Sequence, residues 1–304
     1  MTIIIENQPK SGSPVAASTD VWRLLPGYDL DGVYNMALDE VLLASVTEGG
    51  TPVIRLYTWR PATLSLGVNQ PLGEVDPEEC ARRGFGLVRR MTGGRAVLHQ
   101  HELTYSVIAR ENDPRVSGGV VESYRKISSA LVVGLRSLGA QVELAPPSRA
   151  LHRALAEARR SGDLGELDEE SHGAVCFDAA SDYELTANGR KLVGSAQARR
   201  NGAILQHGSI LLDVDWDAWA SVFAYRTEEG KQRALRKLPT RMTSLREQLG
   251  REVGPEEVAD ALVKGFETTF ALALEPGTPT QKEKTLASDL VLSKYGAEAW
   301  TARK

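Results

Sequence analysis

Two kinds of hydrophobic spacing divide the chain into predicted helices and predicted strands. Apolar residues recur every three or four positions in four segments, which predicts helices over residues 31–48, 121–138, 216–223 and 255–270. Strand-like patterns between turn signals are found over residues 53–59, 63–68, 87–90, 96–98, 103–109, 141–144, 183–186, 191–197 and 203–212. The Asn188-Gly189 pair predicts a hairpin turn between the strands at 183–186 and 191–197. Because strands and helices do not alternate regularly, we predict an α+β fold and not a doubly wound one.

The two ends of the chain and one internal segment differ in character from this main part. Residues 1–20 contain a stretch rich in Ser, Pro and Ala and predict a flexible N-terminal arm. Residues 21–250 form the predicted main domain, and residues 251–304 a C-terminal helical extension. Within the main domain, residues 149–170 are rich in Ala, Arg and acids without a wide apolar face, which predicts a mobile surface insertion.

Composition excludes several classes of protein. A formal net charge of −4 over 304 residues gives no support to nucleic-acid binding, and no apolar run is long enough to span a bilayer. Two cysteines cannot build a disulfide framework or a four-thiolate zinc site. With no signal-peptide pattern at the start of the sequence, we expect a cytoplasmic protein that binds neither nucleic acid nor membrane.

Cys176 is a candidate nucleophile because it lies fifteen residues before Lys191. A thiol reacts as the thiolate, and a nearby ammonium group favours that form. Taken alone, however, a cysteine is more often an inert buried side chain, and a lysine at the start of a strand is more often solvated. Cys80 lies in a short predicted helix with no glycine-rich motif beside it, so an inert thiol is expected there.

A glycine-rich loop lies between two predicted strands, with Arg90, Thr92, Gly93 and Gly94 at its centre and His99 at its end. Paired glycines let a backbone approach a ligand closely, and arginines can hold anionic oxygens. The alternative is an ordinary hairpin turn with surface arginines. No thiol or carboxylate cluster completes a metal site around the histidines, so we expect no metal and at least one structural histidine.

Small residues follow Lys191 and His207 in two of the later predicted strands. After Lys191, the run Gly194-Ser195-Ala196 would open a groove beside a charged strand end. In the next strand, Gly208 after His207 indicates a bulge or a close backbone approach. The alternative is a solvated, charged strand end for the first segment and an ordinary strand interior for the second.

These segments together resemble the biotin/lipoate protein ligase and octanoyltransferase superfamily. Arg89-Arg90-x-Thr-Gly-Gly-x-Ala-Val-x-His99 is similar to its glycine-loop signature, and Lys191-x-x-Gly-Ser-Ala196 with His207-Gly-Ser to its lysine-strand signature. The likeness covers residues 22–213 and implies a biotin/lipoate ligase-like catalytic domain over residues 21–250. It also implies mixed, largely antiparallel sheets flanked by helices. A cysteine upstream of the lysine strand is most similar to the LipM-type octanoyltransferases.

The resemblance implies that an octanoyl group moves from acyl carrier protein, through a thioester on Cys176, to a lysine of a lipoyl-domain protein such as the glycine-cleavage H protein. Lys191 would lower the pKa of the thiol. The acyl and substrate site would consist of Arg90, Thr92, Gly93, Gly94, His99, Gly194, Ser195, Ala196, His207 and Gly208. No metal, ATP or other cofactor is expected, because the thioester is already activated.

Three alternatives stay open from the sequence. The chain could move octanoyl between lipoyl domains as an amidotransferase, or attach free lipoate with ATP as a ligase. It could also be a catalytically silent protein that binds acyl carrier or lipoyl domains. Arg95 in place of a third glycine, and Gln100 where many ligases have Asp, argue against the ligase.

Overall fold

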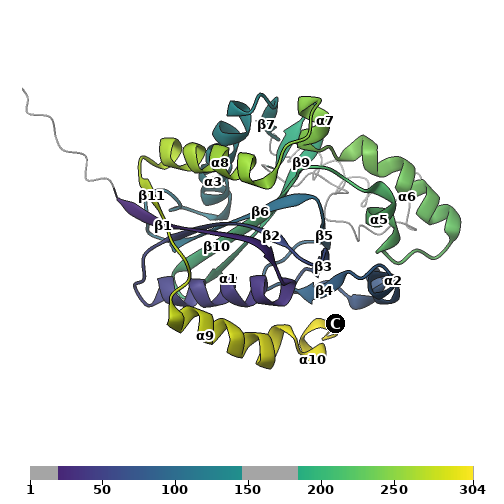
Figure 1. The fold of residues 1–304 in the computed structure, drawn as a ribbon, viewed down its shortest axis with the longest axis horizontal. Helices are drawn as coiled ribbons and strands as arrows, with labels where there is room; N and C mark the ends of the chain where they lie inside the picture. The colour runs from purple at the N-terminus through teal and green to yellow at the C-terminus, as the bar shows by residue number, and fades with distance from the viewer. Residues whose placement is uncertain (1–19, 146–183, 304) are drawn as a thin grey trace, which may run out of the picture.

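A computed structural model describes residues 20–145 and 184–303 (Figure 1). The predicted arm up to residue 19, the predicted insertion over residues 149–170 and Cys176 lie outside the described residues. In the described part, no helix combines the length and the apolar character needed to cross a bilayer.

The main sheet is mixed and largely antiparallel, as predicted. Its eight strands lie in the order β11 (Ala273–Pro276), β1 (Val21–Leu30), β2 (Val53–Trp59), β6 (Glu102–Arg110), β10 (Ala203–Leu211), β9 (Arg190–Arg200), β8 (Leu185–Ala187), β7 (Val142–Leu144). Both pairs made by β1 are parallel, and the pairs from β2 through to β7 are antiparallel. Asn188 and Gly189 join β8 to β9 with φ values of 51° and 74°, which confirms the predicted hairpin turn.

A second, three-stranded sheet carries the glycine-rich loop. It consists of β4 (Gly86–Arg89), β3 (Thr63–Leu66) and β5 (Val97–His99), with β3 in the centre. The 3-10 turn η1 (Leu72–Glu74) and α2 (Pro77–Arg82) connect β3 to β4. Asp76 caps α2, since its carboxylate accepts a hydrogen bond from the Glu79 amide at 2.9 Å and proline occupies the first turn.

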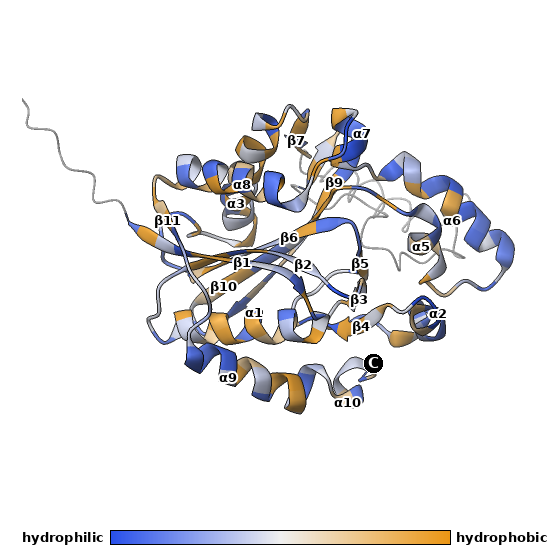
Figure 2. Ribbon diagram, in the orientation of Figure 1, coloured by the Kyte–Doolittle hydropathy of each residue, from blue (hydrophilic) through white to orange (hydrophobic). Residues whose placement is uncertain are grey.

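Helices cover both faces of the main sheet (Figure 1). On one face, α3 (Val120–Ser137) packs against α8 (Pro255–Phe270). The two helices approach each other closely at Gly265 of α8, where an added Cβ would lie 2.5 Å from the carbonyl oxygen of Ala130 in α3. On the other face, α1 (Gly32–Thr47) lies between the sheet and α9 (Gln281–Leu290). This position explains why α1 is rich in apolar residues along most of its length (Figure 2).

The remaining helices follow β10 or end the chain. They are α5 (Trp216–Ser221), α6 (Glu228–Arg241), α7 (Leu245–Leu249), the π-helical turn η2 (Val291–Tyr295) and α10 (Glu298–Thr301). The segment 251–304, predicted as a helical extension, also supplies β11, which pairs with β1 at the edge of the main sheet. β1 was not expected from the sequence, because Pro26 and Gly27 interrupt its alternation.

Candidate functional site

The register of the main sheet places two rows of small or polar side chains beside one cavity. In one row, His207 on β10 lies opposite Ser106 on β6 and Ala196 on β9. In the next row, Ser209 lies between Thr104 and Gly194. Residues directly opposite one another in a sheet share a face, so both rows face the same side.

The cavity lies between these rows, α1 and the small sheet. Its lining consists of Met36, Tyr57, Trp59, Ser65, Arg90, Val97, His99, Thr104, Gly194, Ser195, Ala196, His207, Gly208 and Ser209. Residues from both sequence motifs therefore meet in one place. The cavity has a volume of about 20 Å³. This is room for about one water molecule, so any larger ligand would have to push the walls apart.

Arg90 uses its guanidinium to hold the glycine-rich loop. Its Nη2 donates to the carbonyl oxygens of Gly93 and Arg95 at 2.7 and 2.8 Å, and Nη1 donates to that of Ser65 at 2.9 Å. Nε donates to the Thr92 hydroxyl at 3.1 Å. The arginine was expected to hold substrate oxygens, whereas the structure shows it bound to the oxygens of its own loop.

The two glycines of the loop differ in how closely other atoms surround them. Gly94 has φ +88°, and its carbonyl oxygen approaches Gly67 so closely that a Cβ on Gly67 would lie 1.9 Å away. A Cβ at Gly93 would meet nothing within 4 Å among the described residues. The close contact at Gly67 and the positive φ at Gly94 explain why these two positions hold glycine, whereas no described residue crowds Gly93. Thr92, Gly93 and Gly94 are absent from the described lining of the cavity.

His207 joins the loop to α1 through a buried chain of hydrogen bonds. Its Nδ1 lies 3.1 Å from the Asp39 carboxylate and its Nε2 lies 2.7 Å from the Thr92 hydroxyl. Nδ1 therefore carries the hydrogen, and Nε2 accepts from Thr92. In this state both ring nitrogens of His207 have protein partners, although the ring also lines the cavity.

Asp39 is a buried carboxylate that the sequence analysis missed. Arg55 forms an ion pair with it, and the hydroxyls of Tyr57 and Ser106 donate to it at 3.1 Å each. Burial alone would raise the pKa of Asp39, but Arg55 and then His207 favour the carboxylate, and the net pKa is lowered. One feature of the sequence could have indicated Asp39: it is a charged residue on the apolar side of the predicted helix, and a buried charge requires a partner.

His99 lies at the boundary between this cavity and solvent. Its ring stacks on Trp59 with centroids 3.8 Å apart, and its Nε2 is 2.9 Å from the Ser65 hydroxyl. His101 is separated from it by a turn and has φ 51°, so the two histidines do not share a strand face. Burial lowers the pKa of His99 from 6.5, although Glu102, 3.6 Å away, opposes the shift.

The depressed pKa of His99 predicts a loss of stability in mild acid. Below pH 6.5 the unfolded chain binds a proton at this histidine more readily than the folded protein does. The free energy of unfolding therefore decreases as the pH is lowered, by up to about 1.4 kcal/mol per pH unit. We expect His99→Gln to flatten the curve measured by urea unfolding between pH 7 and 5. Parallel curves for both proteins would contradict this assignment.

Lys191, the second residue of β9, forms a buried ion pair. Its Nζ lies 2.5 Å from the Glu184 carboxylate, and both side chains are 2% exposed. The strand end is fixed by the Thr243 amide, which donates to the Lys191 carbonyl oxygen at 3.0 Å. The solvated strand end considered from the sequence is therefore wrong, since this lysine is buried opposite a carboxylate.

Gly208 confirms the close approach predicted for a glycine inside a strand. An added Cβ would lie 2.7 Å from the Gly194 carbonyl oxygen and 2.7 Å from the Tyr105 ring. The Tyr105 hydroxyl donates to Ser195 Oγ at 2.8 Å, on the side of the sheet away from His207. Cys80 is buried in α2 as expected, and burial raises its thiol pKa to about 11, which disfavours the thiolate.

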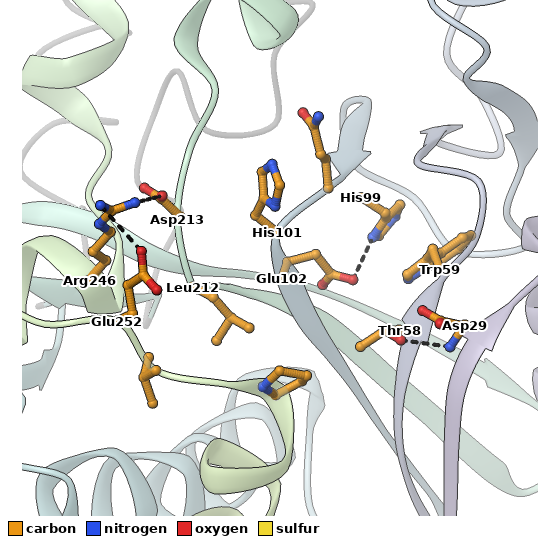
Figure 3. Close-up of a pocket in the computed structure, with 13 residues that line it drawn as sticks. Asp29, Thr58, Trp59, His99, His101, Glu102, Leu212, Asp213, Arg246 and Glu252 are labelled. Atoms are coloured by element: carbon orange, nitrogen blue, oxygen red, sulfur yellow. Dashed lines mark hydrogen bonds and ion pairs between the residues drawn. The ribbon is translucent and has the colours of Figure 1, made fainter.

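A polar cleft of about 490 Å³ lies beside the cavity, and Trp59 and His99 line both (Figure 3). It is formed where β1, β2 and β10 end and β6 begins. Figure 3 shows Arg246 between two acids, 2.7 Å from Asp213 and 3.4 Å from Glu252. Lys191 belongs to the same end of the main sheet, because β9 begins where β10 ends. Among the described residues, no group of acids, histidines and cysteines could hold a metal ion.

Comparisons with known proteins point to one family. A family profile described as the lipoyl protein ligase A/B catalytic domain matches residues 31–267. The chain is 44% identical to "Octanoyltransferase LipM" of Moorella thermoacetica over 94% of this chain and 99% of that protein. It is 40% identical to the protein of the same name from Staphylococcus aureus, over 94% of this chain and 100% of that one.

Solved structures of lipoate ligases share the fold. A bipartite lipoate protein ligase from Thermoplasma acidophilum, described with its E2 lipoyl domain, matches with TM-score 0.74 and 25% identity over 92% of this chain and 96% of that one. A lipoate-protein ligase A bound with ATP matches with TM-score 0.72 and 26% identity, over 92% and 98% of the two chains. The predicted lipoate ligase-like fold is thereby confirmed.

Proposed function

The chain belongs to the lipoyl protein ligase A/B catalytic domain family, as one of its LipM octanoyltransferases, and we propose that it works through a thioester on Cys176. The observation that carries this proposal is the meeting of both sequence motifs at one cavity, through His99 and Arg90 from one and Gly194, Ala196 and His207 from the other. Octanoyl-acyl carrier protein is the proposed donor. A lysine of a lipoyl-domain protein, such as the glycine-cleavage H protein, is the proposed acceptor.

The reaction takes place in two acyl transfers. The Cys176 thiol gives up its proton, and the thiolate attacks the carbonyl carbon of the donor thioester. A new carbon–sulfur bond forms, the bond from this carbon to the carrier sulfur breaks, and the departing carrier thiolate takes up a proton. The neutral amine of the acceptor lysine then attacks the enzyme thioester. A carbon–nitrogen bond forms, the Cys176 sulfur leaves, and the amine gives up a proton, which leaves an amide. No energy from ATP is needed, since a thioester is already more reactive than the product amide.

The hydrocarbon chain would occupy the small cavity, which must widen to admit it. Gly194, Ala196 and Gly208 leave the wall without bulky side chains on two adjacent strands. Met36, on α1, lines the opposite side of the cavity. Its side chain is flexible and unbranched, so it can adapt to a bound chain. A narrow apolar site of this kind favours a straight saturated chain over a bulkier acyl group.

The test of this function is octanoyl transfer by the purified full-length protein without ATP. We expect the mass of the glycine-cleavage H protein to increase by one octanoyl group when octanoyl-acyl carrier protein is the donor. Free lipoate with ATP should give no product. Strict dependence on ATP would instead establish a ligase, and no transfer by folded protein would leave only a binding role.

The amidotransferase alternative needs a different donor in the same assay. Octanoyl-H protein is supplied in place of octanoyl-acyl carrier protein, with a second lipoyl domain as the acceptor. We expect the carrier thioester to react faster, because a thiolate attacks a thioester more readily than an amide. Faster transfer from octanoyl-H protein would assign the chain to the amidotransferases.

A further inference from the structure

The wall of the small cavity contains a buried hydroxyl without a protein partner. Ser209 on β10 is 1% exposed, and its Oγ makes no hydrogen bond within residues 20–145 and 184–303. A polar group left unpaired away from water costs about 1–3 kcal/mol. A ligand atom that pairs with this hydroxyl would remove that cost.

Ser209 lines the cavity, and neither residue directly opposite it on the neighbouring strands binds its hydroxyl. Gly194, directly opposite on β9, has no side chain to cover it. Thr104, directly opposite on β6, is already engaged, since its hydroxyl lies 2.8 Å from the Glu102 carboxylate and accepts from Trp59 Nε1 at 2.8 Å. The hydroxyl thus lies in the cavity wall with no side chain of the facing strands bound to it.

The other polar side chains in the described lining already have partners. The Ser65 hydroxyl binds His99, and the Ser195 hydroxyl accepts from Tyr105. His207 is held on both ring nitrogens, and Arg90 binds the loop carbonyls. Ser209 is therefore the side chain in this part of the wall that remains available for a hydrogen bond to a ligand.

We propose that the Ser209 hydroxyl donates a hydrogen bond to the carbonyl oxygen of the bound acyl group. This inference rests on the proposed function, because an octanoyl group has one polar atom, its carbonyl oxygen, on an apolar chain. Attack on the carbonyl carbon places negative charge on that oxygen, so the same hydrogen bond strengthens in the transition state. Ser209 is then a catalytic residue that also fixes the depth of the acyl chain.

The strand register gives the direction of the acyl chain. Ser209 pairs with Gly194, three residues after Lys191, whereas His207 pairs with Ala196, five residues after it. A carbonyl oxygen at Ser209 therefore leaves the hydrocarbon tail to extend toward Ala196 and Met36, away from the lysine. The reacting carbon stays at the Lys191 end of the strand.

The first test measures binding of octanamide, an unreactive analogue with the same chain and carbonyl group, by calorimetry. We expect Ser209→Ala to bind it at least about tenfold more weakly than the wild-type protein does. Ser128→Ala is the matched control, because Ser128 on α3 is also buried with an unpaired hydroxyl but lies outside the cavity lining. Equal binding by the wild type and Ser209→Ala, or no binding by the wild type, overturns the proposal.

The second test separates this role from a structural one. Octanoyl transfer by Ser209→Ala should fall about tenfold to a hundredfold, while its free energy of unfolding stays unchanged or rises, since no hydrogen bond of the folded protein is lost. A stability loss in Ser209→Ala would reveal a structural partner and overturn the proposal. A wild-type protein that binds octanamide through Ser209 but transfers no octanoyl group would refute the proposed function and leave this site standing.

Discussion

Lys191→Ala is expected to reduce octanoyl transfer by at least about a hundredfold and to destabilise the fold. The loss of activity follows from the ammonium group that we propose favours the Cys176 thiolate, an effect of the size that positioned acid–base groups supply. The loss of stability follows from Glu184, which would keep a buried charge without its ion-pair partner. Breaking a buried pair in this way costs about 3–5 kcal/mol.

A double substitution separates the two effects. Lys191→Met combined with Glu184→Leu replaces the buried ion pair with apolar side chains of similar size, which is often neutral for stability. We expect this variant to unfold near the wild-type urea midpoint and still to be at least about a hundredfold slower. Wild-type activity in the stable double variant would show that the ion pair serves the fold alone.

The thiol pKa of Cys176 gives the direct measure of what Lys191 does. The rate of alkylation against pH is best recorded in a Cys80→Ala background, where a single thiol remains. Cys80 itself should react slowly, because burial raises its pKa to about 11. We expect the pKa of Cys176 to rise in the double variant, and an unchanged value would remove the proposed role of Lys191.

The sequence predicted the local elements well because their signals are local. Asp31 before an apolar helix, the Asn188-Gly189 turn and the mid-strand Gly208 each specify a backbone feature within a few residues. The lack of regular strand–helix alternation was likewise enough to predict the α+β class, and the family resemblance added the mixed sheet. β1 escaped prediction because Pro26 and Gly27 break its alternation, while pairing with β2 and β11 keeps it extended.

The contacts of the site could not be predicted from spacing alone, since they join residues far apart in the sequence. Asp39 meets His207 across 168 positions, and Thr92 meets the same histidine across 115. The sequence motifs named His207 and Thr92 as ligand-binding residues. The structure shows that they bind each other, and through Asp39 they attach the glycine-rich loop to the helix behind it.

The roles of Ser209 and Glu184 also depend on contacts between strands, so the sequence alone did not indicate them. Ser209 was part of the His207-Gly-Ser motif, but its unpaired hydroxyl is visible only when its strand neighbours are in place. Glu184 had no motif, and its pairing with Lys191 depends on the register between β8 and β9. The roles of both residues can be inferred only once the pairing of the strands is known.

Cys176→Ala should abolish octanoyl transfer, the largest effect expected of any substitution in this chain. Without the thiol no enzyme thioester can form, and the acceptor amine would have to attack the carrier thioester without covalent assistance. Cys80→Ala is the matched control, because this second cysteine is buried in α2 and should leave the transfer rate unchanged. Transfer by Cys176→Ala at a rate close to wild type would contradict covalent catalysis.

The most direct test of the whole account is the intact mass of the protein after incubation with octanoyl-acyl carrier protein and no acceptor. Covalent catalysis by Cys176 predicts one added octanoyl group on the wild type and on Cys80→Ala, and none on Cys176→Ala. It also predicts loss of the group when the glycine-cleavage H protein is added. An adduct that persists in Cys176→Ala, or wild-type protein that transfers octanoyl without ever carrying it, would contradict the thioester mechanism.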